Sequence, residues 1–291
     1  MRFLVLVATL ALLTGCSAPG PNPTAGCEQS SPPVALEPVN LGITVASIAN
    51  GAAAIVAALG GQSSILASDL ASDVGVEVIN PGHQIAVEKL LTLEPDVIFI
   101  SSEEPDDVAL SAIATLGATV ISLDSPITFE DSMGQISQIA EALGIPERGL
   151  ELRERILNSI ETLDTAVLAD KDIAFLYLRG NAGVFLMSGS GSGADDIIRL
   201  LGANDVGLEL GISGFAPISP EALANANPDF IIVMQKGLES VGGLEGITKL
   251  PGVMGTTAAE NSGILAAKDS QLLSFGPATA TVLQCLLEQA Q

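Results

Sequence analysis

Short apolar runs alternate with amphipathic stretches in the first part of the chain. Strand-like runs rich in Val and Ile occupy residues 44–48, 65–67, 97–100 and 119–123. Helical patterns fall at residues 52–59, 85–93 and 107–116. Strands that alternate with helices are typical of a parallel sheet covered by helices on both faces. We therefore predict an N-terminal α/β lobe over residues 41–125.

The middle of the chain has no strand-like run. Residues 129–143 and 147–168 are amphipathic, and Ile156, Ile160, Leu163 and Val167 continue one apolar stripe at helical spacing. We predict connecting helices within residues 126–168, the second of them a long rigid helix between two lobes.

The pattern of strands and helices resumes in residues 169–291. Strands are predicted at residues 172–179, 184–187, 230–234 and 264–266, and helices at 194–201, 221–226 and 278–289. The Ser/Gly run at residues 188–193 precedes a helix, where free N–H groups can bind an anion. It lacks the Lys of a P-loop and the spacing of a dinucleotide site, which favours an ordinary loop. The predicted fold is α/β, with two Rossmann-like lobes that have parallel sheets and a ligand cleft between them.

A short internal repeat relates the two lobes. In the first copy, Glu-Lys-Leu begins at Glu88 and is followed by Pro-Asp. In the second copy, which lies 133 residues later (221 − 88 = 133), Glu-Ala-Leu begins at Glu221 and is again followed by Pro-Asp. The one histidine, His83, and the one tyrosine, Tyr177, fall in opposite halves of this repeat. Two related lobes that each carry one metal-competent side chain suggest a ligand held between them.

The first residues resemble an export signal. A basic residue precedes an apolar run at residues 3–13, and Leu-Thr-Gly then leads to Cys16 in the form of a lipobox. We predict a lipoprotein signal peptide over residues 1–15 and a lipid anchor on Cys16; the alternative is an ordinary secretory signal with a chance cysteine. The run is shorter than the roughly 20 residues of a transmembrane helix.

Residues 16–40 are rich in Ser, Pro and Gly, a composition that buries too little apolar surface to fold. We predict a flexible tether here, on a protein that is extracytoplasmic and lipid-anchored to the cell membrane. Cys27 and Cys285 remain after Cys16, and in an oxidising compartment a pair of this kind predicts a disulfide. Two free thiols are the alternative.

The net charge of −23 argues against nucleic acid as a partner, because a phosphate backbone requires clustered Lys and Arg. An enzyme is also disfavoured. The chain has one histidine and no Gly-x-Ser-x-Gly nucleophile elbow.

The residues around Tyr177 favour ligand binding instead. Tyr177 and Arg179 share one face of the predicted strand and lie at its carboxyl end, where open α/β sheets bind ligands. A neighbouring guanidinium favours the charged form of tyrosine. His83 lies in a Pro-Gly loop before a helix. Met234 ends the corresponding strand and is expected to line the cleft; a thioether contact with the ligand is the less favoured reading.

The lipobox, the two α/β lobes, the connecting helix and the repeat resemble the substrate-binding lipoproteins of ABC importers for iron-siderophores, cobalamin and haem. Within that group, His83 before the Glu88 helix and Tyr177-Leu-Arg179 on a strand are similar to the haem-binding HmuT type of actinobacteria. The resemblance implies that His83 and Tyr177 are the two axial ligands of a haem iron and that Arg179 supports the tyrosinate.

The same resemblance implies partners. One acidic residue on each lobe, Glu88 and Glu221, is expected to dock onto a permease dimer that works with an ATPase; two ordinary surface glutamates near helix N-termini are the alternative. Upstream cell-surface haem-binding proteins are further implied partners. A ferric siderophore or cobalamin remains the alternative ligand, although pockets for both favour aromatic residues and this chain has few.

Overall fold

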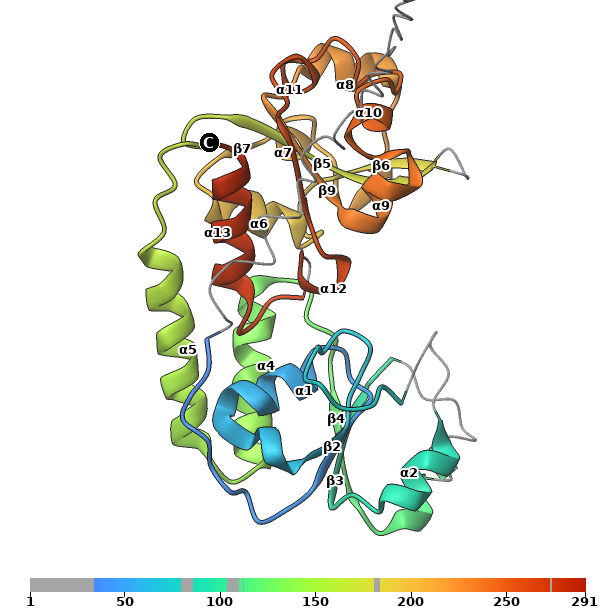
Figure 1. Ribbon diagram of the computed structural model, residues 1–291, viewed down its shortest axis with the longest axis vertical. Coiled ribbons are helices and arrows are strands. Elements are labelled where there is room, and N and C mark those ends of the chain that lie inside the picture. The colour runs from blue at the N-terminus through green and yellow to red at the C-terminus, as the bar shows by residue number, and fades with distance from the viewer. Residues whose placement is uncertain (1–33, 80–85, 104–109, 112, 181–183, 273) are drawn as a thin grey trace, which may run out of the picture.

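Two β-sheets lie one beyond the other along the long axis of the protein, and helices connect them (Figure 1). The computed structural model describes residues 34–79, 86–103, 110–111, 113–180, 184–272 and 274–291. Within them, no helix is long and apolar enough to cross a membrane. The α/β class and the two-lobe arrangement predicted from the sequence are confirmed.

The first sheet is wholly parallel and has the strand order β2-β1-β3-β4. Its strands are β1 (Val45–Ser47), β2 (Ile65–Ala67), β3 (Val97–Ser101) and β4 (Thr119–Leu123). Strand β3 is buried along its whole length, as its unbroken apolar run predicts for a parallel sheet with both faces covered. Helix α1 (Ala52–Val56) continues into a π-helical turn at Ala57–Gly61, and α2 (Val87–Leu93) precedes β3.

The second sheet is mixed, with the order β10-β9-β5-β6-β8 and β7 paired to β5. Its strands are β5 (Asp172–Arg179), β6 (Val184–Ser188), β7 (Asn204–Asp205), β8 (Phe215–Pro217), β9 (Phe230–Met234) and β10 (Ile264–Ala267). Strands β10, β9 and β5 are parallel, whereas β6 is antiparallel to β5 and β8. A parallel pair needs a crossover of a dozen or more residues, and the chain has only four between β5 and β6. The prediction of parallel sheets therefore holds for only part of this lobe.

Two connecting helices, α4 (Phe129–Ala142) and α5 (Pro146–Glu161), pack against each other. Gly149 allows the close approach, because a Cβ there would lie 2.6 Å from the Cβ of Ala140. The predicted extension of the second helix to residue 168 is wrong. Asp164 Oδ1 accepts the backbone N–H of Ala166 (3.1 Å), a local bond that competes with the helical ladder, and the apolar stripe continues through turns instead.

The α-helices of the second lobe are short apart from α13 (Thr279–Gln289). They are α6 (Ala194–Leu200), α7 (Val206–Glu209), α8 (Pro220–Ala226), α9 (Gln235–Ser240), α10 (Gly243–Ile247), α11 (Thr257–Glu260) and α12 (Asp269–Leu272). One apolar core includes Phe99 of the first sheet, Ile136 of α4 and Phe175 of the second sheet. The lobes and the connecting helices therefore share buried surface, which opposes independent motion.

Residues 34–40, predicted as the end of the tether, pack against the first lobe. Leu36 is buried, and its backbone N–H donates to the Ala58 carbonyl (2.7 Å). Arg148 of α5 holds the same segment, since its guanidinium donates to the carbonyls of Leu59 and Glu37. The folded part of the chain thus begins before residue 41.

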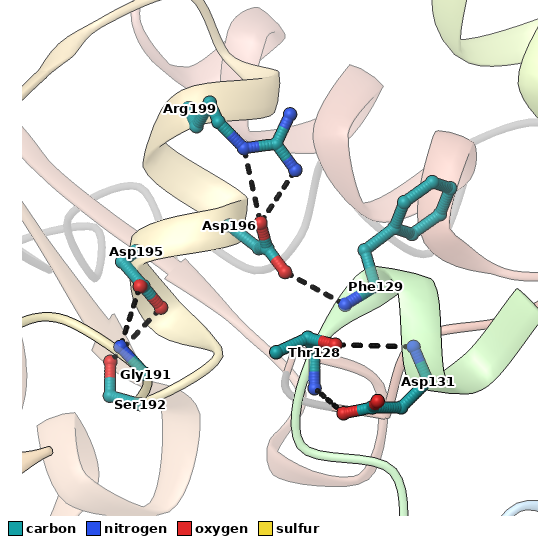
Figure 2. Close-up of polar contacts among 8 residues, drawn as sticks. All are labelled: Thr128, Phe129, Asp131, Gly191, Ser192, Asp195, Asp196 and Arg199. Carbon is teal, nitrogen blue, oxygen red and sulfur yellow. Dashed lines mark hydrogen bonds and ion pairs between the residues drawn. The ribbon is translucent and has the colours of Figure 1, made fainter.

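The N-termini of α4 and α6 meet where the lobes join (Figure 2). Asp196 Oδ2 accepts the backbone N–H of Phe129 (2.8 Å), and its Oδ1 accepts two guanidinium N–H groups of Arg199 (3.1 and 2.5 Å). Ser132 Oγ donates to the Phe275 carbonyl (2.6 Å), and the rings of Phe129 and Phe275 pack edge to face. Polar and apolar contacts together hold the connecting helix α4 to the second lobe at this joint.

Candidate functional site

Strand β5 presents Tyr177 and Arg179 side by side at its carboxyl end. The alternating positions Ile173, Phe175, Tyr177 and Arg179 pass from buried, through half-buried, to exposed. The Arg179 Nε–H donates to the Tyr177 hydroxyl oxygen (2.8 Å), and its guanidinium carbon lies 5.6 Å from the centre of the Tyr177 ring. The predicted common face therefore becomes a direct contact between the Arg179 guanidinium and the Tyr177 hydroxyl.

Aromatic packing fixes the direction of the Tyr177 ring. Phe215 of β8 packs edge to face against Tyr177, with ring centres 6.3 Å apart, and also against Phe175, at 6.0 Å. Such edge-to-face pairs hold a ring in one orientation. The hydroxyl of Tyr177 is thus presented by a rigid strand instead of a loop.

A cavity of about 370 Å³ opens at the carboxyl ends of β5 and β9. Its lining combines residues of β5, β9, α9 and the segment after β10: Tyr177, Leu178, Arg179, Gly180, Met234, Lys236, Gly237, Ser240 and Asp269. Gly180 lets β5 approach α9, because a Cβ there would lie 2.2 Å from the Ser240 carbonyl oxygen. Three of the predicted site residues, Tyr177, Arg179 and Met234, therefore share one cavity.

A second cavity, of about 540 Å³, is lined by residues of both lobes. The first lobe contributes Asn50, Leu70 and Ala71, and the second contributes Gln235, Lys236, Glu239, Lys268, Asp269, Ser270 and Ser274. It shares Lys236 and Asp269 with the Tyr177 cavity, so the two spaces adjoin. Both volumes fall in the range of about 300–1,000 Å³ that small-molecule sites occupy.

Sequence reasoning missed Lys236, Lys268 and Asp269. Lys236 and Lys268 closely follow predicted strands, where an open α/β sheet presents its ligand site, so their position was the available signal. Nothing in the sequence indicated that they line one cavity with residues of the first lobe, because that depends on how the lobes are set against each other. The Lys236 backbone N–H donates to Asp269 Oδ1 (3.0 Å), which joins α9 to α12.

In the Ser/Gly loop before α6, a carboxylate of the protein accepts hydrogen bonds from the donors of the loop. Asp195 Oδ2 accepts the Gly191 N–H (2.8 Å), and its Oδ1 accepts the Ser192 hydroxyl (3.5 Å) (Figure 2). A carboxylate of the protein thus stands where an anion would bind, in agreement with the ordinary loop that the sequence favoured.

The leucines and aspartates of the internal repeat have structural roles. Leu90 and Leu223 are buried, and each repeated Asp accepts a backbone N–H at the start of the neighbouring strand. Asp96 accepts from Thr44, just before β1 (2.7 Å), and Asp229 accepts from Asp172, the first residue of β5 (3.1 Å). These two bonds align β1 with β3 and β5 with β9.

Glu88 and Glu221 are exposed in the first turns of α2 and α8, which lie at opposite ends of the molecule (Figure 1). Within the described parts of the chain, neither carboxylate has a hydrogen-bond or ion-pair partner. Both remain available to a partner protein.

Three predicted functional residues, His83, Cys16 and Cys27, lie outside the described residues. Cys285 is buried on α13 and is disulfide-bonded; its partner is likewise outside them, so the pairing with Cys27 stays a prediction.

Residues 45–270 match the sequence profile of the periplasmic binding proteins. The chain belongs to the periplasmic binding protein family. Members of this family bind substrates for transport, outside the cytoplasm, and are not enzymes. No curated protein matches this periplasmic binding protein.

Solved structures of haem-binding proteins resemble this chain. The haem-binding protein RhuT from Roseiflexus sp. RS-1, in apo form, is 28% identical, with a TM-score of 0.73 over 86% of this chain and 99% of its own. HutB of Vibrio cholerae is 26% identical, with a TM-score of 0.73 over 86% and 96%. HmuT is 28% identical, with a TM-score of 0.70 over 90% and 91%. Further HmuT structures carry alanine in place of one histidine, one tyrosine or one arginine.

Proposed function

We propose that this periplasmic binding protein captures ferric haem between its lobes, with His83 and Tyr177 as axial ligands, and delivers it to an ABC permease for iron acquisition. The observation that carries the proposal is the hydrogen bond from Arg179 Nε to the Tyr177 hydroxyl oxygen (2.8 Å), inside a cavity that adjoins the space between the lobes. A tyrosinate is a known ligand of haem iron, and a guanidinium donor stabilises its charge.

The HmuT variants support this assignment. In that protein the substituted tyrosine and arginine are two positions apart, as Tyr177 and Arg179 are here, and the substituted histidine precedes the tyrosine by roughly a hundred positions. His83 precedes Tyr177 by a similar interval (177 − 83 = 94). The same three residue types therefore recur at comparable spacing in a haem-binding relative.

Delivery would use Glu88 and Glu221. Both are exposed, lack partners within the described chain and occupy matching positions of the repeat at opposite ends of the molecule (Figure 1). A permease dimer, driven by its ATPase, would present one basic site to each. The signal peptide over residues 1–15, the lipid on Cys16 and the tether after it would keep the protein at the membrane. The division into an N-terminal lobe up to residue 125, connecting helices after it and a C-terminal lobe from residue 169 belongs to the same proposal.

A ferric siderophore or cobalamin is the second candidate ligand, because a binding cleft alone does not select among them. Residues of the two adjoining cavities favour haem. Tyr177 is the one aromatic residue among those that line them, whereas an iron ligand with its own supporting cation is present.

The test is a titration of the mature protein with hemin, followed by absorption spectroscopy. Tyr177→Phe keeps the ring against Phe215 and removes only the oxygen, so a changed Soret band reports ligation without loss of packing. His83→Ala should also change the band and weaken haem retention. If the double variant has the spectrum and affinity of the wild type, the ligand assignment is wrong.

The docking assignment needs a separate assay of haem uptake and ATPase stimulation. Reversing Glu88 and Glu221 together to Lys should abolish both while haem binding stays intact. Each exposed ion pair contributes about 1 kcal/mol or less, so the double reversal should exceed either single change. Normal uptake by the double variant would contradict the assignment.

A further inference from the structure

Basic residues gather at the cleft although the chain as a whole is strongly acidic. Of eleven Lys and Arg residues against a net charge of −23, three line the two adjoining cavities. Arg179 and Lys236 belong to the Tyr177 cavity, and Lys236 and Lys268 to the cavity between the lobes. Arg179 is engaged with the Tyr177 hydroxyl, which leaves the two lysines to be explained.

Neither lysine ammonium is neutralised by the protein. Lys89 and Lys249 form ion pairs with Glu77 and Glu245 on the surface. By contrast, across the described parts of the chain, Lys236 and Lys268 have no carboxylate within ion-pair distance and no side-chain hydrogen bond. Both are exposed, so each can reach a ligand in the cleft.

The two acidic residues in this lining are already engaged by neutral donors. Asp269 Oδ1 accepts the backbone N–H of Lys236 (3.0 Å), and Glu239 Oε1 accepts the side-chain amide of Gln235 (3.1 Å). These bonds hold α9 and α12 in place, and neither carboxylate forms an ion pair with a lysine of the lining. Three cationic side chains (Arg179, Lys236 and Lys268) line the two cavities against two carboxylates, a local balance opposite in sign to that of the whole chain.

Apolar side chains stand next to these cations. Met234 lines the Tyr177 cavity, and Leu70 of the first lobe, 53% exposed, lines the cavity between the lobes. An exposed leucine in a cleft favours a ligand with an apolar surface. The lining as a whole suits a flat apolar molecule that carries negative charge along one edge.

We infer that Lys236 and Lys268 bind the two propionate carboxylates of the porphyrin, so that the cleft recognises the carboxylate edge of haem as well as its iron. The inference rests on the proposed function and deepens it. Tyr177 and Lys236 line the same cavity, so a haem ligated through Tyr177 has its edge within the same continuous space as both lysines. The lysines fix the orientation of the porphyrin and select porphyrins with free carboxylates.

The charge of the rest of the chain gives the two lysines a second role. Hemin with ionised propionates is an anion at neutral pH, and a chain of net charge −23 repels it at long range. The excess of cationic over acidic side chains in the cavity lining opposes that repulsion locally. Charge-assisted hydrogen bonds to carboxylates are also about twice as strong as neutral ones.

The experiment compares hemin with hemin dimethyl ester, which has the same iron and ring but no ionised carboxylate. Lys236→Gln/Lys268→Gln should weaken hemin binding by about tenfold or more and leave the Soret band of the complex unchanged, because the axial ligands remain. Binding of the dimethyl ester should be equal in the variant and the wild type. Lys171→Gln is the matched control, since Lys171 is exposed and likewise unpaired within the described residues but precedes β5, at the end away from Tyr177.

Each outcome bears on one of the two proposals. Hemin affinity in the double lysine variant within twofold of the Lys171→Gln control, or equal losses for hemin and its ester, would overturn the role of the lysines. Restoration of hemin affinity by Lys236→Arg/Lys268→Arg would support it. If the wild type gives no Soret change with hemin or its ester, the proposed function itself fails and this inference with it.

Discussion

Asp196 allows a direct test of how the second lobe is held to the connecting helix α4. The first four N–H groups of a helix have no partner within that helix. In α4, Thr128 Oγ1 accepts the Asp131 N–H (3.1 Å), and Asp196 of the second lobe accepts the Phe129 N–H (2.8 Å) (Figure 2). Asp196→Ala removes this bond between the second lobe and α4, and also the ion pair with Arg199.

The magnitude follows from the exposure of each partner. The Asp196 side chain is 17% exposed, and a hydrogen bond to a charged acceptor at such a site contributes about 1.5–3 kcal/mol. Arg199 is 62% exposed, so the ion pair adds only about 0.2–1 kcal/mol. We expect Asp196→Ala to lower the free energy of unfolding by about 2–4 kcal/mol. At roughly 2–4 °C per kcal/mol, Tm should fall by about 4–16 °C.

Urea unfolding followed by circular dichroism measures this loss. Arg199→Ala is the matched control, because it removes the ion pair and leaves the Phe129 N–H with its acceptor; it should cost less than about 1 kcal/mol. Asp196→Asn should fall between the two, since it keeps an acceptor but loses the charge. If Asp196→Ala and Arg199→Ala differ by less than about 0.5 kcal/mol, the bond across the joint does not carry the stability assigned to it.

Three further predictions concern single groups. Arg179→Ala should weaken ferric haem binding less than Tyr177→Ala does. Arg179→Lys should bind haem more tightly than Arg179→Ala, because it returns a positive charge. Equal haem affinity of all Arg179 variants and the wild type in a hemin titration would show that this guanidinium does not support the tyrosinate. Burial raises the pKa of Asp205 above its ordinary value, against the opposing N–H groups of Gly207 and Leu208. The folded protein therefore holds this proton more tightly than the unfolded chain, and the stability from it is lost as pH rises through the folded pKa. As pH rises from acidic to neutral, the free energy of unfolding of Asp205→Asn, measured with urea, should fall less than that of the wild type. Parallel dependences of this free energy on pH for the two proteins would refute the prediction. Peptide mass spectrometry without reduction should find Cys27 joined to Cys285, whereas labelling of both as free thiols would exclude the bond.

The alternation of residues along β5 was sufficient to place Tyr177 and Arg179 on one face. Successive side chains in a strand point to opposite faces whatever surrounds the strand, so this feature depends only on the local backbone. The buried run of β3 was predictable for the same reason, whereas the short strands β7 and β8 were not predicted.

Local pattern was misleading where tertiary contacts or side-chain bonds decide. The apolar stripe of α5 continues past Glu161, yet Asp164 bonds locally and the helix ends. The antiparallel pairing of β6 follows from its connection to β5, which is too short for a crossover. The alternating pattern of strands and helices gave no weight to the length of this connection.

What the sequence by itself determined is the class of the fold, the repeat and the contact between Tyr177 and Arg179, because each depends on residues near one another in the chain. What only the tertiary structure decided is the partnership of distant residues. Asp196 meets Phe129 from 67 positions away, and Lys236 and Lys268 share a cavity with Leu70 of the other lobe. Such contacts depend on how packed elements are set against each other, and no short-range periodicity in the chain encodes that arrangement.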